Sequence, residues 1–315
     1  MSHFLKHDFD HALILSGDQL YQMDFNEMLE AHIAADAEIS IATLPVNAKD
    51  APEFGILKTN HDSVIEAFIE KPHPSLLPEW VSEVSEQMQE KGKKYLASMG
   101  IYIFNKSLLQ ELMADQETKD FGKEIIPQSV GKHKILSYQY EGYWTDIGNI
   151  ESFFEANIGL TADIPEFNLF DNENKIFTRP RLLPPSKFRN SIINQSLISE
   201  GCIINAKEIK SSVIGIRSRI GEGTVLENCY VMGNDFYQDL EELNHESSIN
   251  KIHVGIGENC FIKNALVDKN VRIGNNVHIS GGKHLDNFTN ELYSIKDGIV
   301  VVKKGVTLAD NFRIE

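Results

Sequence analysis

Asp18 is the first residue whose type and position point to chemistry. It lies in the turn Ser16-Gly17-Asp18, directly after the apolar run 12–15, which favours a strand covered on both faces. Open α/β sheets bind ligands at the carboxyl ends of their strands, where a carboxylate can hold Mg²⁺ against bound phosphates. The spacing alone is equally compatible with an aspartate that only caps the following helix.

Asp146 is a second candidate metal ligand, placed between bulky aromatic residues and a glycine in segment 142–148. One Mg²⁺ ion prefers one or two carboxylates together with phosphate oxygens. Asp18 and Asp146 would therefore suffice if the fold brings them together, which their spacing in the sequence does not reveal.

Lys71 ends a predicted strand at 64–69 and stands directly before Pro72. Its ammonium group could bind a phosphate while Glu70 accepts hydrogen bonds from sugar hydroxyls. A solvated Glu–Lys pair without a ligand is the commoner arrangement of such a dipeptide, so both interpretations stay open at this point.

The segments that would position these residues alternate between helix-like and strand-like patterns. Apolar residues recur at three- and four-residue spacing over 25–33, which predicts a helix, and the β-branched segment 39–44 predicts a strand. With the run 12–15 they form a β–loop–α–β unit, the building block of an open parallel sheet. Further elements are predicted as a strand at 97–104, a helix at 108–113, and a polar helix or lid at 75–94.

The second half of the chain has a different pattern. Prolines between 178 and 187 exclude helix and central strand, so segment 166–189 is predicted to connect a domain at 1–165 to a domain at 190–315. In that second domain, aliphatic residues recur at every sixth position, as in Ile220 and Leu226, in Ile256 and Ile262, and in Val267, Ile273 and Ile279. This period predicts a hexapeptide β-helix, interrupted at 234–253 by a polar loop or short helix.

Composition limits the partners. The chain of 315 residues carries 30 basic and 46 acidic side chains, and this net charge of −16 gives it little electrostatic reason to coat nucleic acid or an anionic membrane. Its three cysteines form no Cys-x-x-Cys pair, which favours a reduced, cytoplasmic setting. No apolar run approaches the ~20 residues that a membrane helix needs.

Nine segments, taken in order, resemble glucose-1-phosphate adenylyltransferase (ADP-glucose pyrophosphorylase) over nearly the whole chain. They are residues 13–25, 54–58, 68–72, 96–102, 120–127, 142–148, 180–187, 213–219 and 268–274. The resemblance implies an α/β fold, in which a Rossmann-like nucleotidyltransferase sheet is followed by a left-handed parallel β-helix.

The resemblance also implies a reaction: ATP and α-glucose 1-phosphate give ADP-glucose and pyrophosphate in glycogen or starch synthesis, with Mg²⁺. It assigns Asp18 and Asp146 as the catalytic metal carboxylates. It further implies that four residues bind glucose 1-phosphate, with the lysine on its phosphate: Gly55, Glu70, Lys71 and Ser98.

Similar enzymes are allosteric tetramers, so the resemblance implies a homo- or hetero-tetramer with a sugar-phosphate or phosphoglycerate effector. The basic residues that match effector-binding positions are Arg181, Lys269 and Lys304. Each of the three is equally compatible with an ordinary exposed cation.

The sequence departs from the family at its start. No glycine-rich segment of the Gly-x-Gly-x-Arg-Leu type occurs, and Gln19 stands where a histidine is common. Backbone N–H groups of such a loop supply much of the affinity for a nucleotide. We therefore expect an N-terminally shortened form that is weakly active or inactive.

Three other functions stay open from the sequence. A non-catalytic regulatory or assembly subunit could pair with a complete partner through its β-helix. A nucleotidylyltransferase could make another sugar nucleotide. A hexapeptide acyltransferase would need a catalytic histidine in the repeats, for which His253 and His278 are the candidates.

Overall fold

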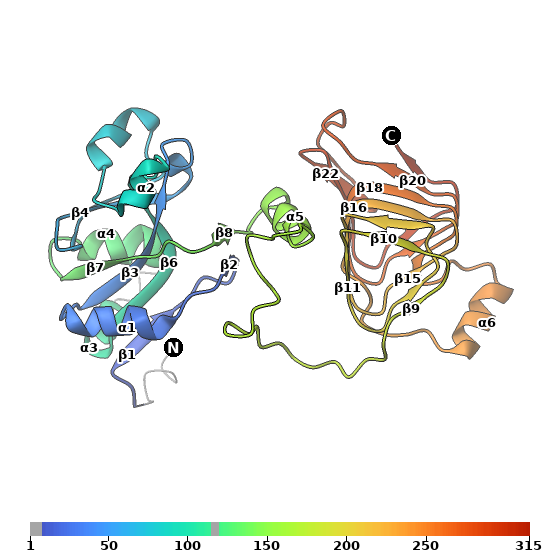
Figure 1. The fold of residues 1–315 in the computed structure, drawn as a ribbon, viewed down its shortest axis with the longest axis horizontal. Coiled ribbons are helices and arrows are strands. Elements are labelled where there is room, and N and C mark those ends of the chain that lie inside the picture. The colour runs from blue at the N-terminus through green and yellow to red at the C-terminus, as the bar shows by residue number, and fades with distance from the viewer. Residues whose placement is uncertain (1–7, 115–119) are drawn as a thin grey trace. The chain divides into compact units, whose positions relative to one another are not determined.

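The computed structural model describes residues 8–114 and 120–315 (Figure 1). The chain divides into two compact units, the first ending at Trp144 and the second beginning at Thr145. Strand β8 (Trp144–Asp146) spans the division. This division falls before residue 165, where the sequence suggests that the first domain ends.

A mixed sheet forms the core of the first unit. Its strand order is β5-β4-β6-β3-β7, and β1 pairs with the C-terminal part of β6. The strands are β1 (His11–Ile14), β3 (Ile39–Val46), β4 (Gly55–Thr59), β5 (Ile65–Glu70), β6 (Tyr95–Asn105) and β7 (Ile135–Gln139).

The direction of the strands differs from the parallel sheet that the sequence suggests. Among the described strands of this sheet, only β3 and β7 pair in parallel, while β4 runs antiparallel to β5 and β6 runs antiparallel to β1, β3 and β4. Strands β1 and β3 therefore run in the same direction on either side of β6. The predicted β–loop–α–β unit is present, but β6 lies between its two strands and runs antiparallel to both.

Helix α1 (Phe25–Ala34) links β1 to β3. It is capped at its N-terminus by Asp24, whose carboxylate accepts a hydrogen bond of 2.8 Å from the Asn26 N–H. This unit also contains several short elements: β2 (Gln19–Tyr21), a 3₁₀ helix (Ala51–Glu53), α2 (Glu86–Glu90), α3 (Lys106–Leu112), a π-helix (Phe121–Ile125) and α4 (Ile126–Ser129). Segment 75–94, predicted as one polar helix or lid, is divided between a 3₁₀ helix that begins one residue earlier (Pro74–Trp80) and α2.

His32 ties helix α1 to the sheet from a fully buried position. Its Nε2 lies 2.9 Å from Asn105 Oδ1, which can only accept, so Nε2 carries the proton and donates. Its Nδ1 then accepts from the Ser40 hydroxyl at 2.7 Å. Burial lowers the pKa of His32 below its ordinary value, which outweighs the opposing effect of the Asn105 hydrogen bond.

This lowered pKa predicts a specific loss of stability in mild acid. Below the ordinary histidine pKa of about 6.5, the unfolded chain binds a proton at His32 that the folded chain does not. The free energy of unfolding should then fall with pH, by at most about 1.4 kcal/mol per pH unit for this proton. Urea unfolding of the His32→Gln variant between pH 7.5 and 5 should show a shallower pH dependence than the parent.

The exposed His61, whose side chain is 83% accessible, is the matched control. His61→Gln should leave the pH dependence unchanged. Equal slopes for the parent and His32→Gln would contradict the assignment of a neutral, buried His32.

The second unit is a three-sided parallel β-helix. One face carries β9 (Lys187–Phe188), β12 (Ile203–Ile204), β15 (Arg219–Ile220), β17 (Gly255–Ile256), β19 (Arg272–Ile273) and β24 (Thr307–Leu308). The other two faces carry β10 (Ile192–Asn194), β11 (Leu197–Ile198), β13 (Glu208–Lys210), β14 (Val213–Ile214), β16 (Val225–Val231), β18 (Phe261–Val267), β20 (His278–Ser280), β23 (Ile299–Val302) and β25 (Arg313–Ile314). A hairpin of β21 (Phe288–Thr289) and β22 (Tyr293–Lys296) pairs with β23.

The six-residue aliphatic period is confirmed as the core of this β-helix. Every aliphatic residue in the predicted series is at most 5% exposed: Ile220, Leu226, Ile256, Ile262, Val267, Ile273 and Ile279. The expected interruption is also confirmed, because helix α6 (Leu240–Ser248) lies within 234–253.

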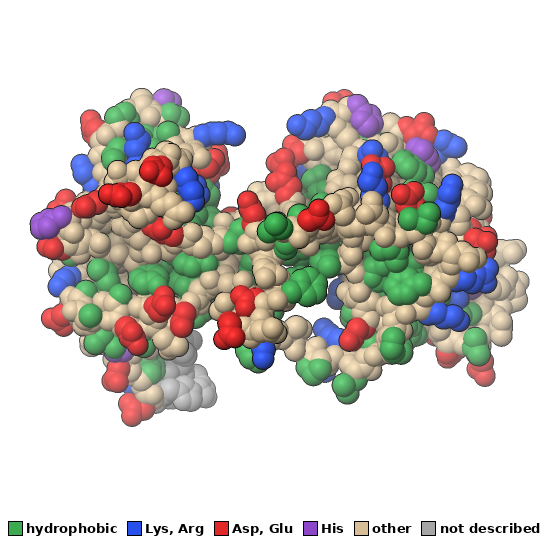
Figure 2. Space-filling view, in the orientation of Figure 1, with side chains coloured by type: hydrophobic (Ala, Val, Ile, Leu, Met, Phe, Trp, Pro, Cys, Tyr) green, Lys and Arg blue, Asp and Glu red, His purple; other side chains and the backbone are tan. Residues whose placement is uncertain are grey.

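Helix α5 (Ile150–Gly159) belongs to the second unit, where its buried Phe154 packs against Leu266 and Ile299 of the β-helix. Between α5 and β9 the chain forms turns and irregular structure. On the face in Figure 2, acidic and basic side chains are interspersed. No helix in the described ranges is long and apolar enough to cross a membrane.

Candidate active site

Asp18 is an exposed carboxylate in the loop after β1. The Ser16 hydroxyl donates to Asp18 Oδ1 at 2.6 Å. Helix α1 is capped by Asp24, so a capping role for Asp18 is excluded. This loop lies beside β6, since a Cβ atom added to Gly100 would lie 3.6 Å from that of Ser16.

Gly55 and Glu70 face each other across the β4–β5 pair. A Cβ atom on Gly55 would lie 2.7 Å from the Phe68 ring and 2.9 Å from Glu70 Oε2. Real Cβ atoms do not approach other atoms this closely, so a larger residue at position 55 would displace the ring or the carboxylate. The absence of a side chain at Gly55 therefore leaves room for the Glu70 carboxylate in its observed position.

Ser98 and Tyr102 both lie in β6, and their side chains share a hydrogen bond. Burial raises the pKa of the Tyr102 phenol, and the nearby carboxylates of Asp120 and Glu70 act in the same direction. The phenol therefore remains protonated and can donate. The structure thus gathers Glu70 and Ser98, two of the predicted sugar-phosphate residues, around Tyr102.

Neither Tyr102 nor Asp120 is a candidate from the sequence pattern alone. The signal for Tyr102 was hidden because it lies in an apolar strand and is only 7% exposed, which is typical of a core residue. Both residues lie in segments that carry the family resemblance, 96–102 and 120–127, and only that resemblance could have pointed to them.

Lys71 directly follows β5 and is exposed. Its backbone is left-handed, with φ of +46°, and its N–H donates to the Phe54 carbonyl at 3.0 Å. A non-glycine residue with this conformation is uncommon and indicates a tightly specified turn. Within the described part of the chain, Lys71 forms no ion pair with Glu70, so its ammonium is available to a ligand.

Gln19 is held by Trp144, whose indole N–H donates to Gln19 Oε1 at 3.2 Å. The Trp144 ring also packs edge-on against Phe54, with centroids 5.6 Å apart. Gln19 thus joins β2 to Trp144 at the start of β8. Similar enzymes commonly have a histidine at this position.

Asp146 lies in the second unit, where its Oδ1 accepts a hydrogen bond of 2.7 Å from the Gly148 N–H. Asp18 lies in the first unit, so a metal site shared by the two carboxylates stays a prediction. Among the described residues, no three His, Cys, Asp or Glu side chains gather as a metal site. A site for Mg²⁺ needs only one or two carboxylates when phosphates supply the other ligands.

Two of the three predicted effector residues lie near one carboxylate. Lys269 Nζ is 3.0 Å from Asp235 Oδ1. Hydrogen bonds from Asn270 and Lys269 lower the pKa of Asp235, and the charge of Lys304 acts in the same direction. Arg181 is exposed and forms no ion pair within residues 8–114 and 120–315. The sequence contained no signal for Asp235.

Two protein families match this chain. Residues 1–163 match the family model described as nucleotidyl transferase. The chain belongs to that family. Residues 181–312 match the model for the GLGC left-handed parallel β-helix domain, which gives the handedness of the coil. A nucleotidyl transferase domain followed by this β-helix is the architecture of ADP-glucose pyrophosphorylase, so the resemblance and the fold class are confirmed.

The crowding at Gly55 in this nucleotidyl transferase predicts an effect on stability. Gly55→Ala should lower the free energy of unfolding by about 1–3 kcal/mol, because the added methyl group overpacks a site bounded by a partly buried ring. Urea unfolding measures the change.

Gly17→Ala is the matched control, since a Cβ atom there would meet nothing within 4 Å. It should be neutral or slightly stabilising, because alanine reduces the freedom of the unfolded chain. Equal stabilities of the two variants would contradict the described packing around Gly55.

Proposed function

We propose that this nucleotidyl transferase is a sugar-nucleotide synthase of the glucose-1-phosphate adenylyltransferase kind, acting in glycogen or starch synthesis. It would convert ATP and α-glucose 1-phosphate to ADP-glucose and pyrophosphate. The cluster of Gly55, Glu70, Ser98 and Tyr102 carries the proposal, because it offers a carboxylate and two hydroxyls on strands β5 and β6, which flank β4 in one sheet. These groups suit sugar hydroxyls, and the neighbouring Lys71 suits a phosphate.

In the proposed mechanism, the enzyme mainly positions its two substrates. Lys71 binds the phosphate of glucose 1-phosphate, while Glu70 and Ser98 hydrogen-bond the sugar. A phosphate oxygen of the sugar phosphate then attacks the α-phosphorus of ATP in line, and pyrophosphate leaves. Such a reaction needs orientation and neutralisation of charge rather than a covalent enzyme intermediate.

Mg²⁺ is the proposed cofactor, held by Asp18 and Asp146. Asp18 fits this role, because it is exposed and only one of its oxygens accepts a hydrogen bond among the described residues. When bound, the ion would neutralise charge on the nucleotide phosphates. The two aspartates would orient the ion against those phosphates.

Regulation is proposed at Arg181, Lys269 and Lys304, with a sugar phosphate or a phosphoglycerate as effector and a homo- or hetero-tetramer as the assembly. An anionic effector would compete with Asp235 for Lys269, since the two side chains already form an ion pair of 3.0 Å. The ion pair with Asp235 would thus lower the affinity of Lys269 for the effector.

The substrate assignment is tested by binding and by product. Calorimetry should detect glucose 1-phosphate binding to the chain, at least about tenfold weaker in Lys71→Ala because a charge-assisted phosphate contact is lost. Lys91→Ala, which removes another exposed lysine of the first unit, is the matched control and should bind like the parent.

Product formation tests the nucleotide. The chain is incubated with Mg²⁺, glucose 1-phosphate and an equimolar mixture of ATP, UTP, dTTP and GTP, and the products are identified by mass spectrometry. Slow formation of ADP-glucose that disappears in Asp18→Asn is expected. A different sugar nucleotide, or equal binding by Lys71→Ala and Lys91→Ala, would contradict the proposal.

A further inference from the structure

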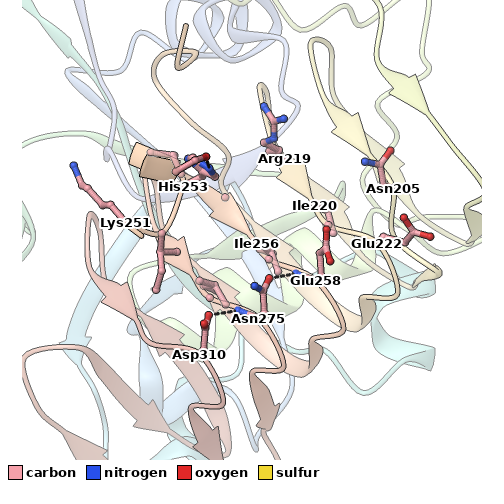
Figure 3. Close-up of a pocket in the computed structure, with 18 of the residues that line it drawn as sticks. Asn205, Arg219, Ile220, Glu222, Lys251, His253, Ile256, Glu258, Asn275 and Asp310 are labelled. Carbon is pink, nitrogen blue, oxygen red and sulfur yellow. Dashed lines mark hydrogen bonds between the residues drawn. The ribbon is translucent and has the colours of Figure 1, made fainter. Parts of the chain in front are cut away.

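A groove of about 690 Å³ runs along one face of the β-helix, entirely within the second unit (Figure 3). Its floor is formed where β15, β17 and β19 end, and one wall is formed by Ser247 and residues 250–254. Pockets that bind small molecules commonly have volumes of roughly 300–1,000 Å³. The β-helix groove plays no part in the proposed synthase reaction.

Glycines interrupt the isoleucine side chains along the floor of the β-helix groove. Gly221, Gly257 and Gly274 occupy equivalent positions in successive coils. A Cβ atom on Gly221 or Gly257 would lie 2.4 or 2.5 Å from the carbonyl oxygen of the next coil. The stacking of the coils therefore requires glycine, and it leaves bare backbone that a ligand can approach closely.

The wall is held in place before any ligand binds. The side chain of Glu246 in α6 is 9% exposed and forms a bidentate ion pair with Arg272, at 2.9 and 2.8 Å. Its carboxylate also accepts from Lys251 at 3.0 Å and from His253 at 3.2 Å. These contacts hold the pKa of Glu246 far below its ordinary value, so the carboxylate stays charged and the wall stays fixed near neutral pH.

The two edges of the groove carry different chemistry. Figure 3 shows Arg219, Lys251 and His253 along one edge. The Arg219 guanidinium is exposed and has no ion-pair partner in the part of the chain that the structure describes. It is therefore a free cation beside a floor of backbone, which suits a phosphate group.

The opposite edge carries carboxylates and amides, including Glu258, Asn275 and Asp310. The Glu258 N–H donates to Asn275 Oδ1 at 2.8 Å, and the Asn275 N–H donates to Asp310 Oδ1 at 2.7 Å. These bonds fix both side chains and leave Asn275 Nδ2 and Asp310 Oδ2 for a ligand. Donors and acceptors in this arrangement match hydroxyl groups.

We propose that the β-helix groove binds a phosphorylated sugar, with its phosphate on Arg219 and its hydroxyls on Asn275, Glu258 and Asp310. A ligand that is anionic throughout, such as a nucleic acid strand, would be repelled by the carboxylate edge. A neutral sugar would leave Arg219 unused. A molecule with one anionic end and a hydroxyl-rich body satisfies both edges.

Calorimetric titration with glucose 6-phosphate tests this proposal. The double variant Lys71→Ala, Lys269→Ala serves as the parent, so that the proposed substrate and effector sites both contribute little. Glucose 6-phosphate should bind more tightly than either inorganic phosphate or glucose. Arg219→Gln should weaken its binding at least about tenfold, because the charge-assisted contact is lost.

Arg313→Gln is the matched control, since Arg313 is also exposed but pairs with Glu315 outside the groove. It should bind like the parent. Ser247→Trp is a second variant, which should block the groove with bulk from an exposed wall position. Equal affinity of Arg219→Gln and Arg313→Gln would overturn the proposal, as would unchanged binding in Ser247→Trp or no binding by the parent. None of these results depends on ADP-glucose synthesis.

Discussion

Backbone pairing along β6 is the constraint on which the first unit depends. This eleven-residue strand pairs with β1, β3 and β4, so it joins the two halves of the sheet. The same strand carries Ser98 and Tyr102 and passes the loop of Asp18 at Gly100. The polar cluster of Glu70, Ser98 and Tyr102 is thus positioned by the backbone hydrogen bonds of the sheet, whose strands hold side chains more precisely than a loop does.

Some parts of the fold could be predicted because they depend on local patterns. The helix over 25–33 was visible in its apolar spacing, and the β-helix in its six-residue period, because each pattern reflects which side chains face a core. The direction of β6 could not be predicted, because strand pairing joins residues far apart in the sequence, such as Ile14 and Tyr102. The predicted parallel sheet was wrong for that reason.

The candidate site divides in the same way. Asp18, Glu70 and Lys71 could be proposed from polar residues at strand ends, where sheets commonly bind ligands. Tyr102 could not, since a buried tyrosine in an apolar strand is typical of a core residue. Asp235 and Glu246 lie in the polar segment 234–253 that interrupts the β-helix. Their ion pairs with Lys269 and Arg272, which are distant in the sequence, could not be read from that segment.

A crystal structure of the chain soaked with glucose 1-phosphate would test most directly whether the polar cluster on β6 is a sugar-phosphate site. We expect the sugar in contact with Glu70 and Ser98, and its phosphate within hydrogen-bond distance of Lys71. Glucose 1-phosphate bound elsewhere in the first unit, with the cluster empty at saturating concentration, would contradict the account.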